Sequence, residues 1–422
     1  MSRSVPEGWN KLKMGIIGTF STSSINKKSK ENEISVSLLN YMDIYQNSVL
    51  TNSYPFQQVT APTKQVTSSC VQNGDVFFTP SSETPNDIGH SAVFLGDSDS
   101  LVHSYHTIRF RLNEDDYLDD NYKAYAFKED TTYEYFLKRA TGSTRFTLSL
   151  PSFNELEVLA PPLPEQKKIA SILTSVDEVI ENTQKQIDKL QDLKKATMNE
   201  LLTKGIGHTE FKDSELGRIP KSWEVQPLRG LSTKVGSGVT PRGGSSVYQD
   251  HGIIFIRSQN VHFDGLMLDD VAYISEQIHA GMKGSMVCGG DVLLNITGAS
   301  IGRCTVVPND FPEGNVNQHV CIIRPINSLY NKFLGIWLSS DYGQDQIMRF
   351  QAGGNREGLN FEQIRSIKIP VPSIQEQEKA SEVVDSIQVL ISEVQSKLTQ
   401  TQSLKKSLMQ DLLTGKVRVT VN

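Results

Sequence analysis

The chain has 422 residues, too many for one ordinary domain of about 100–200 residues, so we expect two large domains or a repeated unit. Hydrophobic residues make up 37% and charged residues 21%, which supports packed cores and argues against a disordered chain. The net charge of −6 argues against a protein that coats nucleic acid through bulk positive charge.

Residues 1–160 contain short runs rich in Val, Ile and Phe, separated by Gly, Asn, Asp and Pro, a pattern typical of β strands. The run Gly74–Phe78 is one example. Because no run of 18 apolar residues occurs and Met1–Lys11 lacks an apolar signal core, we expect no membrane span and no Sec export, and a cytoplasmic protein. We interpret residues 1–160 as a mixed, mostly β domain.

From about Glu165 to Thr203 the chain has no Gly or Pro, and one stripe of residues recurs at alternating steps of four and three. Such a/d spacing, sustained over heptads, predicts a coiled-coil helix of roughly 55–60 Å. Pro161, Pro162 and Pro164 prevent its extension toward the N-terminus. The stripe consists of Ile169, Leu173, Val176, Ile180, Thr183, Ile187, Leu190, Lys194, Thr197 and Leu201.

The stretch Gly205–Trp223 is polar and Gly-rich, and we interpret it as a linker. Residues 225–370 again contain strand-like runs, with a helical insert at Lys332–Leu338 whose copy in the first half we place around Tyr133–Leu137. A second helix follows Pro370 and Pro372. Its stripe consists of Ala380, Val384, Ile387, Ile391, Val394, Leu398, Thr401, Lys405, Leu408 and Leu412.

The second half of the chain repeats the first. A shift of 211 residues superposes Gly142 on Gly353 and Arg145 on Arg356, and the match continues without a gap to the ends of both helices. Upstream, Pro6-x-x-Trp9 corresponds to Pro220-x-x-Trp223, and Gly74-Asp75-Val76 to Gly290-Asp291-Val292. Each helix stripe needs a partner, and the other copy is the nearest candidate. The alternative is that each helix is buried in its own domain.

A duplicated unit that ends in a helix can close head to tail. Thr414-Gly415 would then return near Pro6, as Thr203-Lys204 leads to Pro220, and the two helices would run antiparallel. The polar stripe residues fit this pairing as register devices, since they penalise wrong alignments. These residues are Thr183, Lys194, Thr401 and Lys405.

The segment Pro161–Gln166, followed by a Lys-rich helix and the ending Leu201–Gly205, resembles the central conserved region of specificity subunits of type I restriction–modification systems. The lead-in Glu215–Trp223 is similar too. The second half adds segments that resemble the target recognition domains of that family, although the first half lacks the Gly-x-Thr-Pro loop. These segments are Gly238–Pro241, Ile256–Ser258, Gly290–Leu293, Gly298–Gly302 and Gly358–Asn360.

The resemblance implies an α+β fold: two mixed, mostly β target recognition domains separated by two long antiparallel coiled-coil helices, with an internal pseudo-two-fold repeat. The expected parts are recognition domain 1 (1–160), the central helix (161–204), the linker and repeat lead-in (205–224), recognition domain 2 (225–370) and the C-terminal helix with its tail (371–422). The implied function is a DNA specificity subunit that reads a bipartite, asymmetric target and scaffolds the other subunits.

The implied partners are double-stranded DNA, two methyltransferase subunits and the restriction/translocase subunits, with no membrane. Residues 1–160 have 14 Lys+Arg against 19 Asp+Glu, and residues 225–370 have 12 against 12. Because DNA affinity rises with the phosphates neutralised, we expect weak binding by this chain alone and an obligate complex. The alternative is a coiled-coil scaffold that joins two ligand-binding domains and has no DNA role.

Base reading in a DNA groove needs Arg for guanine and Asn or Gln for adenine, on loops that approach closely. The aligned loops 141–145 and 352–356 fit best; the alternative is a turn whose Arg pairs with Glu155 or Glu362. Gln318 and His319 could instead only pair strands, and Thr297–Ser300 could receive a phosphate. The candidates are Ser81, Ser82, Gly142, Ser143, Thr144, Arg145, Thr240, Arg242, Arg257, Gln259, Asn260, Thr297, Gln318, Gly353, Asn355 and Arg356.

Catalytic motifs are missing from the sequence. It has no phosphate-binding Gly-x-x-x-x-Gly-Lys-Ser/Thr loop, no Asn-Pro-Pro-aromatic motif and no Gly-x-Gly turn for S-adenosylmethionine. The four cysteines form no CxxC pair, so zinc at Cys304, His319 and Cys321 is not expected, and His103 and His106 fit a structural pair. We therefore expect a non-catalytic chain without cofactor or metal, inside a type I restriction and adenine methyltransferase complex whose partners use S-adenosylmethionine, ATP and Mg. A third alternative is an enzyme with an unrecognised site.

Overall fold

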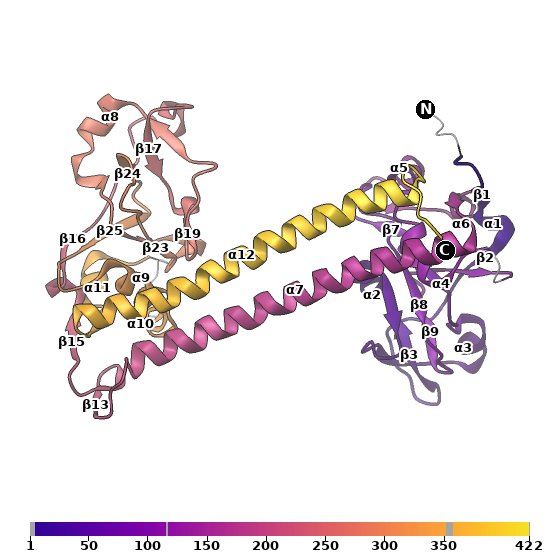
Figure 1. The fold of residues 1–422 in the computed structure, drawn as a ribbon, viewed down its shortest axis with the longest axis horizontal. Coiled ribbons are helices and arrows are strands. Elements are labelled where there is room, and N and C mark those ends of the chain that lie inside the picture. The colour runs from indigo at the N-terminus through magenta and orange to yellow at the C-terminus, as the bar shows by residue number, and fades with distance from the viewer. Residues whose placement is uncertain (1–4, 115–116, 352–357, 422) are drawn as a thin grey trace. The chain divides into compact units, whose positions relative to one another are not determined.

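The computed structural model describes residues 5–114, 117–351 and 358–421, and the chain divides into two compact units. Unit 1 consists of residues 1–184 and 396–422, and unit 2 of residues 185–395. Two long helices, α7 (Leu163–Thr203) and α12 (Ile374–Leu413), each contribute one half to either unit (Figure 1). Every unit therefore holds one recognition domain and parts of both helices.

The recognition domain of unit 1 is built on a five-stranded sheet in the order β2-β10-β6-β8-β4. Tilted rings of Phe20, Phe78, Phe110 and Phe153 pack together in its core. A three-stranded sheet, β5-β3-β9, completes the domain. The bounds are β2 (Gly18–Thr22), β3 (Ile34–Leu39), β4 (Val49–Thr51), β5 (Gln57–Ala61), β6 (Val76–Phe78), β8 (Ser91–Leu95), β9 (Leu101–His103), β10 (Ile108–Leu112), α1 (Met14–Ile17), α2 (Tyr41–Gln46), α3 (Thr63–Ser69), α4 (Asp120–Ala126), α5 (Asp130–Arg139) and α6 (Leu150–Asn154).

The recognition domain of unit 2 contains two four-stranded sheets, β16-β25-β22-β23 and β20-β17-β24-β21. In the second sheet β17 and β24 run parallel, so their carboxyl ends lie at the same edge. The bounds are β16 (Ser232–Ser237), β17 (Ile253–Ile256), β18 (Val261–His262), β19 (Gly265–Leu266), β20 (Ala272–Ile274), β21 (Met286–Val287), β22 (Val292–Asn295), β23 (Cys304–Val306), β24 (Gly314–Val316), β25 (Val320–Pro325), α8 (Glu276–Gly281), α9 (Asn331–Ser339), α10 (Asp341–Gln351) and α11 (Phe361–Ser366), with short 3-10 turns at 228–230, 244–247, 258–260, 283–285 and 298–300.

The sequence repeat is also a structural repeat. The strand order β2-β10-β6-β8 of unit 1 recurs as β16-β25-β22-β23 in unit 2. In both units the repeated Gly-Asp-Val segment supplies a carboxylate that is only 1% exposed, Asp75 or Asp291. Each carboxylate receives two hydrogen bonds from an arginine on the neighbouring strand, Arg111 at 2.6 and 2.5 Å and Arg324 at 2.7 and 2.8 Å. This charge pair therefore joins the two central strands of each sheet.

One expected correspondence between the repeats is wrong. The insert Lys332–Leu338 does form a helix, α9, but its copy is α4 rather than Tyr133–Leu137. The backbone N–H before α4 donates to the Gln166 side chain at 2.8 Å, and the N–H before α9 donates to Gln377 at 2.7 Å. The stretch around Tyr133 belongs to α5, which follows α4 as α10 follows α9 in unit 2. The sequences of α4 and α9 have diverged, so the hydrogen bond to the glutamine, rather than sequence similarity, shows that these two helices correspond.

Each repeat has near its start a tryptophan that contacts the first turn of a long helix. The Trp9 indole N–H donates to Glu165 and that of Trp223 donates to Glu376, both at 3.1 Å. Gly415, past the end of α12, packs so closely on Pro6 that a Cβ there would lie 2.6 Å from the proline ring. Gly205 packs in the same way on Trp223 and Glu376. The head-to-tail return of the chain is therefore observed within unit 1, and its counterpart within unit 2.

The stretch interpreted as a linker contains a hairpin, β13 (Phe211–Ser214) and β14 (Gly217–Pro220). Gly217 has a φ of 94°, a left-handed conformation that favours glycine at this turn. The strand that follows, β15 (Glu224–Pro227), pairs with β26 (Lys368–Val371) just before α12. In unit 1, β1 (Asn10–Lys13) pairs in the same way with β12 (Glu157–Ala160) before α7. Sequence analysis missed β1 and β13 because most of their residues are polar.

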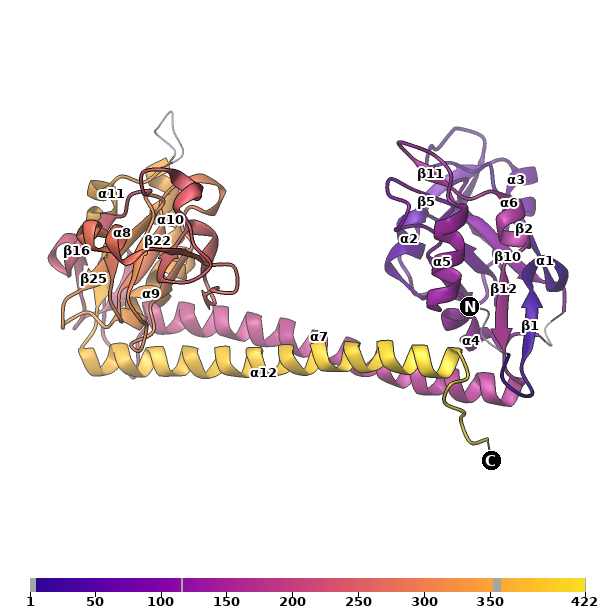
Figure 2. The ribbon, with the colours of Figure 1, turned by 90° about the horizontal axis from the view of Figure 1, so that it is seen from above.

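The predicted helix stripes are buried or half-buried along both helices. In unit 1, Lys405 of α12 forms an ion pair with Asp177 of α7; in unit 2, Lys194 of α7 donates to Gln388 of α12 at 2.6 Å. A shift of 211 residues relates the two lysines, and also Asp177 and Gln388, so the units contain two copies of one contact. In each unit an early part of one helix meets a late part of the other, as an antiparallel pair requires (Figures 1 and 2). The contacts support the interpretation of both lysines as register devices.

We expect Asp291→Ala to destabilise the protein by about 3 kcal/mol, because it leaves the Arg324 guanidinium and the Cys288 N–H without their acceptor. Glu210→Ala, which breaks the exposed pair between Glu210 and Lys221, should cost less than about 1 kcal/mol. Urea unfolding followed by tryptophan fluorescence measures both. Equal effects of the two substitutions would refute the structural importance of the buried pair.

Candidate nucleic-acid interface

In the first recognition domain, strand pairing joins two segments that the sequence singled out separately. The short strand β11 (Phe146–Thr147) pairs with β7 (Ser81–Ser82), which places the exposed loop Gly142–Arg145 beside Ser81. The guanidinium of Arg145 donates to the Ser81 hydroxyl from Nε at 3.3 Å and from Nη2 at 3.2 Å. The expected alternative partner, Glu155, is not the group that Arg145 contacts. Figure 2 shows β11 at the end of this domain opposite α7.

The tight turn that presents Arg145 requires a glycine. Gly142 has a φ of 136°, and a Cβ at this position would collide with the Arg145 carbonyl oxygen. Ser143 and Thr144 form the exposed tip between them. The sequence pattern of Gly and Arg flanking small polar residues is therefore explained by the geometry of this loop.

A groove of about 500 Å³ lies next to Arg145. It contains two cations, Lys27 and Arg145, and the aromatic rings of Tyr41, Tyr45 and His106. Burial, and then the charges of Arg145 and Lys27, lower the pKa of His106, so its imidazole stays neutral at neutral pH. The carboxylates on the rim are Glu83 and Asp87. Sequence analysis missed Lys27 and both tyrosines because they lie between β2 and β6, where the residues of the first half do not recur in the second half.

In the second recognition domain, three candidates are joined by a chain of side-chain hydrogen bonds. Thr240 donates to the carbonyl oxygen of Gln318, the Gln318 amide nitrogen lies 2.9 Å from Nε2 of His319, and Nδ1 of His319 is bonded to the Thr297 hydroxyl. Thr240 and Gln318 are exposed. The four residues follow the ends of β16, β24 and β22, which meet at one edge of the domain.

The two domains place equivalent segments together. Thr297 forms a β-bridge with Gly358, as Ser81 does with Thr147 in the first domain. The repeat shifts of 216 and 211 residues relate Ser81 to Thr297 and Thr147 to Gly358. The candidates Gly353, Asn355 and Arg356 lie outside the described residues. The bridge shows that residue 358, where the description resumes, lies beside Thr297.

The candidate residues that follow β17 differ in whether their side chains are accessible to DNA. Arg257 donates to the Asp270 carbonyl at 3.1 Å, and Gln259 donates to the Asp270 carboxylate at 3.1 Å. Asn260 is 2% exposed and its amide donates to the carbonyls of Met267 and Asp270, so it holds the loop in place. Ser82 is buried too, whereas Arg242 is exposed on a loop that turns at Gly243 with a φ of 103°.

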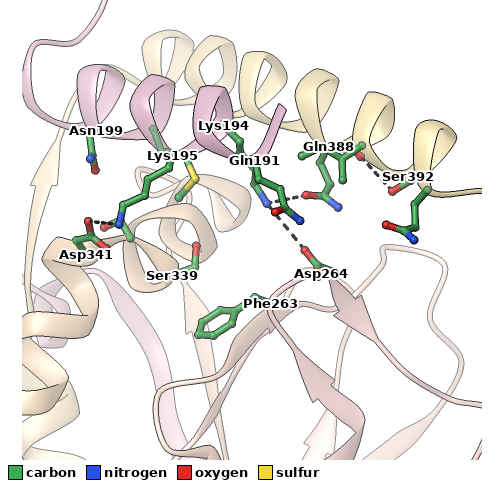
Figure 3. Close-up of a pocket in the computed structure, with 14 residues that line it drawn as sticks. Gln191, Lys194, Lys195, Asn199, Phe263, Asp264, Ser339, Asp341, Gln388 and Ser392 are labelled. Carbon is green, nitrogen blue, oxygen red and sulfur yellow. Dashed lines mark hydrogen bonds and ion pairs between the residues drawn. The ribbon is translucent and has the colours of Figure 1, made fainter. Parts of the chain in front are cut away.

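A cavity of about 520 Å³ in unit 2 lies under the β18–β19 hairpin, between α7, α12 and the turn that precedes α10. Lys195 pairs there with Asp341 at 3.1 Å, and Lys194 lies 4.0 Å from Asp264 and 2.6 Å from Gln388 (Figure 3). Phe263 is at the tip of the hairpin. None of the candidate DNA-contact residues lines this cavity.

Among the described residues, the ionisable side chains suited to metal binding do not form a cluster. In the described part of the chain no group of three or more His, Cys, Asp or Glu side chains could hold a metal. Burial raises the pKa of the Cys304 and Cys321 thiols to about 12. Burial, helped by Arg109 and Arg111, lowers the pKa of His103 to about 3, and its Nδ1 lies 3.0 Å from the Thr107 hydroxyl. Likewise, no described helix has the length and apolar content to span a membrane.

The geometry thus defines a duplicated protein in which two α+β domains present loops at strand ends and share a frame of long helices. Residues 6–192 and 220–412 match the family described as type I restriction modification DNA specificity domain, and the chain belongs to this family. It is a type I restriction–modification specificity subunit, a class that contributes recognition rather than catalysis. The predicted resemblance to specificity subunits and the predicted α+β fold with an internal repeat are confirmed.

Similar proteins agree with this assignment. The chain is 30% identical over 308 residues to the type I restriction enzyme MjaVIII specificity subunit of Methanocaldococcus jannaschii, covering 72% of this chain and 71% of that protein. It is 28% identical over 358 residues to the putative MjaX specificity subunit of the same organism, covering 82% and 79%. In fold it resembles an S subunit from M. genitalium, with a TM-score of 0.56, 16% identity and coverage of 98% of this chain and 97% of the other.

The buried thiols should not react in the folded protein. At a pKa of about 12, roughly one thiol in ten thousand is ionised at pH 8, and both sulfurs are inaccessible. We expect iodoacetamide to label the exposed Cys288 in the native protein, and Cys304 and Cys321 only after unfolding. Peptide mass spectrometry locates the label. Fast labelling of Cys304 in the native state would contradict the buried environment.

Proposed function

We propose that this subunit reads a bipartite, asymmetric DNA target, one half-site per recognition domain, and organises methyltransferase and restriction subunits around it. The observation that carries the proposal is the equivalence of two backbone contacts: Thr147 pairs with Ser81 in one domain, next to the loop Gly142–Arg145, and Gly358 pairs with Thr297 in the other. A duplicated frame that presents two different sets of side chains is suited to reading two different half-site sequences.

The chemistry of the two sites supports different words. In the first domain Arg145 offers a charged donor pair beside Lys27 and aromatic rings, the groups suited to guanine and to the backbone. In the second domain the hydrogen-bonded groups exposed at the strand ends are neutral, the Thr240 hydroxyl and the Gln318 amide. Two half-sites read by such different groups would differ in sequence.

The helices offer surfaces for partner subunits. Beside the buried stripe, α7 exposes Val179 (44%) and Leu193 (51%), and α12 exposes Leu390 (48%) and Leu404 (54%). The shift of 211 residues relates Val179 to Leu390 and Leu193 to Leu404, so the same apolar surface occurs twice. Two copies of one surface fit two methyltransferase subunits, and apolar side chains repeated on a helix are typical of interfaces.

The charge balance supports an obligate complex. Because the recognition domains have no excess of Lys and Arg, the partner subunits would supply most phosphate contacts. A structure that this chain resembles with a TM-score of 0.62, 15% identity and coverage of 99% of this chain and 100% of the other is described as concerning complex assembly of the type I R-M system. In our proposal S-adenosylmethionine, ATP and Mg bind to the partners, and this chain binds none.

The test is methylation mapping. The chain is co-expressed with its methyltransferase, and methylated adenines are located by sequencing. We expect two different short words separated by an unread spacer. Methylation that ignores sequence, or no change when the subunit is omitted, would favour the alternative of a scaffold without a DNA role.

Arg145→Ala should relax the base preference at one position of one half-site, and should leave the spacer and the other half-site unchanged. A bidentate Arg–guanine contact contributes about 1–3 kcal/mol of discrimination. Arg139→Ala is the control, since Arg139 stacks on Tyr135 at 3.8 Å and lies on α5. Methylation maps of both variants measure the effect. Relaxation of positions in both words would contradict a contact confined to one domain.

The helices should set the spacer. Four residues inserted after Thr203 add about 6 Å if helical, and DNA rises about 3.4 Å per base pair, so the spacer should lengthen by one or two base pairs with both words preserved. Four residues inserted after Ser98, in the loop between β8 and β9, serve as the control and should not change the spacer. Changed words at an unchanged spacing would refute this prediction.

A further inference from the structure

The hydrogen bonds around Gln318 hold its amide between Thr240 and His319. Thr240 donates to Oε1. With this orientation Nε2 of His319 accepts from the amide nitrogen, and the imidazole proton is on Nδ1, where it is donated to Thr297. With the amide flipped, Thr240 would accept and the other tautomer of His319 would donate, so either orientation leaves the amide one N–H and one oxygen lone pair.

The backbone around the amide is held as firmly as the side chain. The N–H of Asn317 donates to the Ile256 carbonyl at 3.0 Å, and the Asn317 carbonyl accepts from Gly238 at 3.1 Å. The His319 carbonyl accepts from Ile296 at 2.9 Å. Contacts from three strand ends therefore fix residues 317–319, and an exposed amide held between two partners loses little entropy on binding.

After these bonds, the Gln318 amide keeps one N–H and one oxygen lone pair for a ligand. In the major groove adenine presents an acceptor, N7, beside a donor, the N6 amino group, which is the complement of this set. Guanine presents two acceptors, N7 and O6, so one of them would face the amide oxygen with no hydrogen between. A fixed amide thus favours adenine over guanine by attraction and by repulsion.

We propose that Gln318 reads an adenine in the second half-site, and that His319, with Thr240, is the positioning residue that orients the amide. The inference rests on the proposed function and names the residue and base that deepen it. His319 touches no base in this scheme; it acts only through Gln318.

The test is methylation mapping with the full-length chain in complex with its methyltransferase. Gln318→Ala should lower adenine preference at one position of the second word roughly 10- to 100-fold, as the loss of a bidentate contact implies. Gln318→Glu should move the preference at that position to cytosine, whose N4 amino group donates to a carboxylate. Gln277→Ala, an exposed glutamine on α8, is the matched control and should keep the map of the unsubstituted chain.

The positioning role has its own readout. His319→Phe removes the hydrogen-bond partner of the amide and should weaken adenine preference at the same position, but should have no further effect there when combined with Gln318→Ala. A general disturbance of the domain would instead add to the Gln318→Ala effect or alter neighbouring positions, and either outcome overturns the role of His319.

The outcomes separate this inference from the function it rests on. If the unsubstituted complex methylates without sequence preference, the proposed function fails. If it has a bipartite target and Gln318→Ala leaves every position unchanged, only the inference fails. If Gln318→Ala abolishes methylation altogether, the Gln318→Glu complex is tested on a DNA target that has cytosine at the assigned position. Methylation of this target supports the inference, and no methylation overturns it.

Discussion

The structure depends on how each recognition domain is attached to a helix. In the first turn of each helix two adjacent side chains make this attachment, Glu165-Gln166 and Glu376-Gln377; Glu165 and both glutamines are buried, and Glu376 is half-buried. The glutamate accepts the indole proton of the tryptophan near the start of its repeat, and the glutamine bonds three backbone groups of its own domain. Because the helix start and the domain share one hydrogen-bond network, the helix cannot rotate about its axis without breaking contacts to the domain.

The frame and the loops obey different constraints. The central strands are tied by a buried carboxylate–arginine pair, and any change there leaves a charge without a partner. The loops at the strand ends carry exposed side chains, so Gly142–Arg145 and the Thr240–Gln318 region can differ in chemistry while the sheets stay alike. Such a division keeps the position of a recognition group constant and leaves its identity free.

Sequence analysis predicted the parts that repeat and missed the parts that do not. The helices and their stripe follow from residues that recur at a fixed shift, whereas the hydrogen bond between Trp9 and Glu165 is known only from the structure. The pairing of Ser81 with Thr147 was not predicted, because two-residue strands have no periodicity. Lys27 and Tyr41 do not recur in the second half, and the hydrogen bond between Gln318 and His319 depends on side-chain geometry that spacing cannot show.

The two copies of the cross-helix lysine contact are not equivalent in their physics. Lys405 faces a carboxylate on the partner helix, Asp177, whereas Lys194 faces the neutral amide of Gln388 there, and the exposed carboxylate of Asp264 lies 4.0 Å away on the β18–β19 hairpin. Dissolved ions screen the attraction between two full charges and barely alter a hydrogen bond to an amide. Added salt should therefore weaken the cross-helix contact of Lys405 more than that of Lys194.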